Sequence, residues 1–151
     1  MIELNYALNT IFFLISGAMV MWMAAGFTAL EAGSVRTKNV TEILTKNVAL
    51  FSVASIAFLL CGYGVMYGWK EPTTHSMYAD FFFQMVFVAT AMSVVSGAVA
   101  ERKKLWSFLI FSAIFAGLIY PLQGSWTWGG GFLSELGFFD FAGSGIVHMA
   151  G

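Results

Sequence analysis

The chain has 151 residues, of which 59% are hydrophobic and only 10% are charged, so its composition is that of a membrane protein and excludes an ordinary soluble domain. Its formal net charge of −1 gives no reason to expect nucleic acid or another polyanion as a partner. A single cysteine, Cys61, excludes a disulfide framework and a cysteine-based metal site, and its apolar surroundings predict a small core residue.

Four uncharged apolar stretches are each close to the length of about 20 residues that a membrane-spanning helix needs. They cover residues 6–30, 47–69, 81–100 and 105–122. A fifth apolar stretch covers residues 140–151 only, which is roughly half the length of a span. The sequence therefore predicts an all-α integral membrane protein, a multi-span helical bundle that is truncated in its fifth span.

Positive charges are unevenly divided between the two sets of loops that join these stretches. Six of the seven Lys and Arg residues follow the first and third stretches: Arg36, Lys38, Lys46, Arg102, Lys103 and Lys104. The opposite set of loops contains Lys70 alone. Because Lys and Arg in short loops are retained on the cytoplasmic side, this asymmetry predicts a multi-pass protein of the cell membrane with its N-terminus outside.

Aromatic residues gather in two parts of the sequence that the predicted topology brings to the outer surface. Phe83 and Phe87 are four residues apart, so they share one face of the third span near its outer end. Trp126 and Trp128 follow the fourth span, next to a run of three glycines. Tryptophan faces attract cations without a formal charge, but helix packing and an interfacial aromatic belt are alternative roles for these residues.

Two ionisable residues mark the start of the fifth stretch. Asp140 precedes its first turn, where a carboxylate typically caps free backbone amides. His148 follows inside the apolar sequence. An ionisable side chain at that depth is costly unless it has a partner or faces a cavity, so His148 is either a packed residue with a satisfied ring or part of a pathway.

Three segments together resemble the ammonium transporter family (Amt/Mep/Rh): TALEAGSVRTKN at 28–39, DFFFQMVFVATAMSVVSGAVAER at 80–102 and PLQGSWTWGGGFLSELGFFDFAGSGIVHMAG at 121–151. The resemblance implies the N-terminal portion of such a protein, about the first five-span repeat of an inverted-repeat fold. The implied function is ammonium transport, with capture at an outer aromatic vestibule and passage as ammonia. The alternative is a membrane ammonium sensor or assembly module that retains the vestibule without transport.

The resemblance also implies roles for individual residues. Trp128 matches the tryptophan of the vestibule, Phe87 matches one phenylalanine of the gate, and Phe83 matches an aromatic residue beside it. Asp140 matches an aspartate that organises the site, and His148 matches the first of two histidines that relay protons. No cofactor is expected, and no metal site either, because His75 in the polar loop at 71–77 has no second type of ligand nearby. The partners it implies are ammonium or ammonia, the lipid bilayer, further copies in a homotrimer and a cytoplasmic PII signalling protein.

The remaining charged residues indicate no further chemistry. No nucleophile–base pair, phosphate loop or nucleotide fingerprint is present in the sequence, which argues against an enzyme. Glu31 with Arg36, and Glu101 with Arg102, predict solvated ion pairs at the cytoplasmic surface.

Overall fold

The structure is a computed structural model that describes residues 2–151, apart from the side chains of Ile2 and Ala142. Regular structure in this range is helical, as the sequence predicts. The longer helices are α1 (Ile2–Ser34), α2 (Val40–Ala57), α4 (Met77–Ala98) and α5 (Leu105–Ile114). The shorter ones are α3 (Tyr63–Tyr67), α6 (Tyr120–Ser125) and α7 (Phe132–Glu135). Single π-helical turns, Phe58–Gly62 and Phe115–Ile119, join α2 to α3 and α5 to α6.

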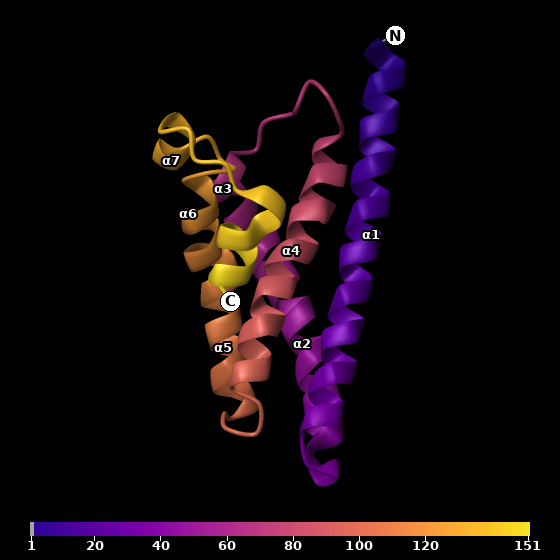
Figure 1. Cartoon of the computed structure of the whole chain (residues 1–151), viewed down its shortest axis with the longest axis vertical. Helices are drawn as coiled ribbons and strands as arrows, with labels where there is room; N and C mark the ends of the chain where they lie inside the picture. The colour runs from indigo at the N-terminus through magenta and orange to yellow at the C-terminus, as the bar shows by residue number, and fades with distance from the viewer. Residues whose placement is uncertain (1) are drawn as a thin grey trace.

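Four helices in the described range are long and apolar enough to cross a membrane: Glu3–Ser34, Thr37–Tyr67, Met77–Ala98 and Leu105–Ser125. They run alternately in opposite directions, which confirms the helical membrane bundle (Figure 1). The second and third helices end two residues before the expected stretches do, at Tyr67 and Ala98. The last segment, a 3₁₀ turn followed by the π-helical residues Ser144–Met149, packs against α4 and α6.

Packing divides the bundle into an inner group of helices and one outer helix. Helix α2 packs against both α4 and α5, whereas α1 lies along α4 at the edge of the bundle (Figure 1). Leu50, Phe58 and Met92 are among the fully buried core residues. On α1, Trp22 is 80% exposed, as expected of a helix face that lipid or further protein covers.

The π-helical turn of the second span explains two side chains. Its packed side carries Phe58 and Gly62, so Cys61 lies on the outward side and is exposed. The prediction of a core cysteine is therefore wrong. A Cβ atom at Gly62 would lie 2.7 Å from the Ala116 carbonyl oxygen and 2.9 Å from Pro121 Cγ. Glycine is required here because a larger residue would push the second and fourth spans apart.

Glu31 is buried rather than solvated, and its partner is Lys46 instead of Arg36. Glu31 is 5% exposed, and its Oε2 accepts hydrogen bonds from Lys46 Nζ at 3.0 Å and Asn47 Nδ2 at 3.1 Å. Lys46 Nζ also donates to the Ser96 carbonyl at 3.2 Å. The prediction fails because α2 begins at Val40, seven residues before the expected span, so Lys46 lies on the buried face of a helix. The cluster joins α1, α2 and α4.

Glu101 also has a different partner from the one that the sequence suggests. Its carboxylate accepts hydrogen bonds from Asn39 Nδ2 at 2.6 Å and from the backbone nitrogen of Arg36 at 3.0 Å, with Arg36 Nε at 3.2 Å. Glu101 has a φ of 62°, in the left-handed region that favours glycine. The hydrogen bond from Asn39, followed by those from Arg36, lowers the pKa of Glu101 to about 2. This contact ties together the two loops at the basic end of the bundle.

Candidate functional site

A cavity of about 490 Å³ opens at the end of the bundle that carries α3, the start of α4 and the loop after α6. Six residues line it: Tyr67, Phe83, Gln84, Phe87, Trp128 and Gly143. Three of them are the aromatic residues expected at a vestibule, and they come from two segments far apart in the sequence. We call this space the aromatic cavity.

The three rings contact one another in sequence along the wall of the aromatic cavity. The ring centroids of Phe83 and Phe87 are 4.9 Å apart with an interplanar angle of 80°, and those of Phe87 and Trp128 are 6.2 Å apart at 69°. Edge-to-face pairs of this kind hold the rings in fixed orientations. The backbone nitrogen of Trp128 donates to the Gly124 carbonyl at 2.9 Å, which anchors its loop to α6.

Trp126 occupies a different environment from its neighbour two residues later. Its side chain does not line the aromatic cavity, and its ring packs against Phe132 with centroids 5.6 Å apart. It is 44% exposed. The contact with Phe132 supports the loop that carries Trp128. Substitution of Trp126 can therefore serve as a control for substitution of Trp128, because only Trp128 lines the aromatic cavity.

Gly143 closes the aromatic cavity beside Trp128. Its φ of 71° lies in the left-handed region, which glycine adopts without strain. A Cβ atom at this position would lie 2.8 Å from Val147 Cγ2 and 3.5 Å from the Trp128 ring. Glycine therefore allows the chain to turn into the last helical segment while remaining close to the tryptophan.

Asp140 anchors the last helical segment, Ser144–Met149, through two hydrogen bonds to its backbone. Its Oδ1 accepts a hydrogen bond from the Gly145 backbone nitrogen and its Oδ2 accepts one from Ile146, each at 3.0 Å. These are cap contacts, but they pass over the 3₁₀ turn Phe141–Gly143 and reach the start of the following helical segment. Asp140 does not line the aromatic cavity, and its contacts fix the backbone that carries Gly143 and His148.

His148 also lies outside the aromatic cavity and connects to it through one hydrogen bond. Its Nδ1 is 3.1 Å from the Gly143 carbonyl oxygen. Because a carbonyl can only accept, the contact requires a proton on Nδ1, and the second ring nitrogen, Nε2, points away from it. Among the residues that the structure describes, none covers the His148 side chain, which is exposed. Its Nε2 atom is therefore accessible to a hydrogen-bond partner.

Sequence reasoning missed three lining residues and one buried acid. Tyr67 and Gly143 reach the aromatic cavity through packing of distant segments, which no local pattern reports. Gln84 carried a usable signal, because it is a polar amide between Phe83 and Phe87 in an apolar span. Asp80, which directly precedes the third apolar stretch, is only 8% exposed.

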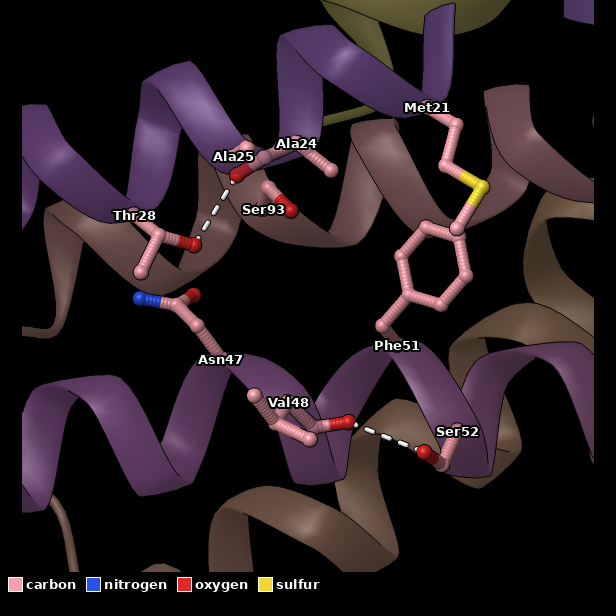
Figure 2. A pocket seen from close by; sticks show the side chains of 9 residues that line it. All are labelled: Met21, Ala24, Ala25, Thr28, Asn47, Val48, Phe51, Ser52 and Ser93. Atoms are coloured by element: carbon pink, nitrogen blue, oxygen red, sulfur yellow. Dashed lines mark hydrogen bonds between the residues drawn. The ribbon is translucent and has the colours of Figure 1, made fainter. Parts of the chain in front are cut away.

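A second cavity of about 360 Å³ lies between α1, α2 and α4, and Figure 2 shows its lining side chains. Thr28 donates to the Ala24 carbonyl, Ser52 donates to Val48 and Ser93 donates to Ala89, so their hydroxyl groups are satisfied within their own helices. Asn47 is engaged with Glu31 and Ser96. The polar groups of this cavity already have protein partners, so it is the weaker candidate for a ligand site.

Four helices long and apolar enough to cross a membrane, with a cavity lined by aromatic rings at one end, define a helical membrane protein. The model of the protein family described as Ammonium Transporter Family matches residues 11–151. The chain belongs to this family.

Individual relatives agree with the family match. Ammonium transporter Amt2 of Archaeoglobus fulgidus is 42% identical over 91% of this chain and 35% of its own length. Ammonium transporter Amt2 of Haloferax mediterranei is 39% identical over 95% of this chain and 36% of its own length. Ammonium transporter 3 of Dictyostelium discoideum is 34% identical, with 97% and 37% covered. The chain therefore spans a little over a third of the length of the curated relatives it matches.

Proposed function

We propose that the complete protein transports ammonium across the membrane and that this chain supplies its outer capture site. The observation that carries the proposal is that Phe83, Phe87 and Trp128 line one cavity, with their rings in edge-to-face contact. Aromatic rings attract a monovalent cation without the strong hold of a directly bound carboxylate, which suits turnover. The relatives are named as ammonium transporters and not as enzymes, which supports ammonium as the substrate.

The proposed orientation has the N-terminus outside and the aromatic cavity open to the outer surface. Loops 35–39 and 99–104 lie together at one end of the bundle and carry most of the exposed cations. The aromatic cavity lies at the opposite end. Because cationic loops are retained in the cytoplasm, this arrangement supports capture from outside.

The proposed path continues from the aromatic cavity towards His148. Ammonium releases a proton and passes on as neutral ammonia, while His148 accepts the proton at Nε2 and passes it to a second histidine. The hydrogen bond from Nδ1 to Gly143 supports this role because it leaves Nε2 free. Asp140 organises this region through its bonds to Gly145 and Ile146. Assembly as a homotrimer and control by a PII protein stay predictions from the family resemblance.

The test of transport uses the full-length protein in proteoliposomes. We expect saturable ammonium-driven currents that empty liposomes lack. In His148→Leu we expect loss of charge movement while ammonia permeation continues, because the apolar side chain cannot accept a proton. Absence of current from the wild-type protein would refute transport, and unchanged current in His148→Leu would refute the proton relay.

A further inference from the structure

Asp80 is a buried acid beside the aromatic cavity, and the proposed path assigns it no role. It lies in the first turn of α4 and is 8% exposed. The Tyr63 hydroxyl donates to its Oδ2 at 2.7 Å, and Gln84 Nε2 makes a longer hydrogen bond to its Oδ1 at 3.5 Å. Both neighbouring groups donate hydrogen bonds to the carboxylate and neither accepts one from it, which is the pattern of an ionised carboxylate.

The charge of Asp80 is poorly balanced by the protein. Within residues 2–151, the basic group near its carboxylate is His75, whose Nε2 lies 3.9 Å from Oδ1, and no Lys or Arg in this range pairs with it. The His75 ring also contacts Thr74 through Nδ1 at 2.9 Å and stacks on Phe13 with centroids 4.3 Å apart. An intramembrane acid without a firm cationic partner is costly and indicates a functional role.

Gln84 connects Asp80 to the aromatic cavity. The side chain of Gln84 lines the cavity, while its amide nitrogen faces the carboxylate. In the described part of the chain, neither the Gln84 Oε1 atom nor the hydroxyl of Tyr67, another lining residue, has a hydrogen-bond partner. Buried polar atoms without partners are uncommon and are typical of sites that a ligand or water completes. The wall between Asp80 and the cavity is therefore polar and negatively polarised.

We infer that Asp80 determines the preference of the aromatic cavity for a cation over a neutral amine, with Tyr63 and Gln84 holding its carboxylate in place. This inference rests on the proposed function of the cavity. A fixed negative charge separated from the ligand by one side chain attracts a cation without direct contact. The ligand is thus favoured in its protonated form and remains free to leave, as transport requires.

The test compares Asp80→Asn with Asp80→Glu in the full-length protein, by methylammonium uptake into proteoliposomes. Asparagine keeps the side-chain size and an oxygen that accepts from Tyr63, but it removes the charge. We expect its half-saturation concentration to rise about tenfold, as for the loss of one partly screened charge several ångström away, with maximal uptake per assembled protein unchanged. Glutamate keeps the charge, so its half-saturation should stay within about threefold of wild type.

A purely structural role for Asp80 predicts the reverse order, because asparagine keeps the side-chain size and the bond from Tyr63, whereas glutamate is longer. Glu71→Gln is the matched control: Glu71 is an exposed acid at the same end, outside the aromatic cavity, and its loss should change half-saturation less than about twofold. An unchanged half-saturation in Asp80→Asn, or a tenfold loss in Asp80→Glu, would overturn the inference. If Asp80→Asn does not assemble, the glutamate variant decides. Absence of saturable uptake by wild type would instead refute the proposed function.

Discussion

Lys46→Met tests the buried ion pair that joins α1, α2 and α4. Lys46 and Glu31 are 7% and 5% exposed, and their charged groups are 3.0 Å apart. At an effective dielectric constant of about 20, two unit charges at this separation attract by roughly 5 kcal/mol. Removing one partner of a buried pair costs about 3–5 kcal/mol, because the other charge is left without compensation. We expect Lys46→Met to lower the free energy of unfolding by an amount in this range.

The cost falls on Glu31, whose surroundings offer little replacement for the lost ammonium group. Its Oε1 already lacks a hydrogen-bond partner among the described residues, and its Oε2 would keep only the bond from Asn47. Lys46 Nζ also lies 5.3 Å from the centre of the Phe108 ring, a cation–π contact that methionine cannot make. The double variant Glu31→Gln with Lys46→Met removes both charges and should recover much of the lost stability.

The assay is reversible unfolding of the full-length protein in mixed micelles, with wild type, both single variants and the double variant. The four free energies form a double-mutant cycle, and we expect a coupling energy on the order of 3 kcal/mol. Lys38→Met is the control, since Lys38 is an exposed lysine at the same end and its loss should cost less than about 0.5 kcal/mol. Additive single effects, with coupling below about 0.5 kcal/mol, would refute the assignment.

Two further predictions concern Asp140 and Glu101. Asp140→Ala should reduce recovery of assembled protein by removing the bonds to both Gly145 and Ile146. Asp140→Asn keeps one acceptor oxygen and so one of these bonds, and it should retain more assembled protein than the alanine variant while changing transport. Equal loss of assembly in both variants would contradict this account. Glu101 has a folded-state pKa of about 2 against a usual value of 4.5, so its contribution to stability is complete above pH 4.5 and is lost as the pH falls towards 2. Acid unfolding of Glu101→Gln should lack this component, and an identical acid profile would contradict it.

The sequence predicts the helical bundle because its apolar stretches are long and almost free of charge, a signal that tertiary packing does not change. It also predicts the shared face of Phe83 and Phe87, since a spacing of four places two residues on one side of any helix. The contact of Phe87 with Trp128 joins two distant segments, and only the family resemblance suggested it.

Other features depend on helix boundaries and on packing between helices. The predicted pairing of Glu31 with Arg36 was wrong, because α2 begins at Val40 and therefore places Lys46 inside a helix instead of a loop. The sequence indicates no role for Gln84 or Asp80, which lie in and directly beside an apolar span. Their contact with each other and with the aromatic cavity follows from the way α4 packs against α3 and the loop after α6.

The central claim, that the aromatic cavity captures ammonium, is tested most directly by the half-saturation concentration for methylammonium uptake in Trp128→Leu and Trp126→Leu of the full-length protein. Loss of one cation–π contact of about 1 kcal/mol should raise this concentration roughly fivefold in Trp128→Leu. Trp126→Leu should stay within about twofold of wild type, since Trp126 lies outside the cavity. An unchanged half-saturation concentration in Trp128→Leu, or equal effects of the two variants, would contradict the assignment of the capture site.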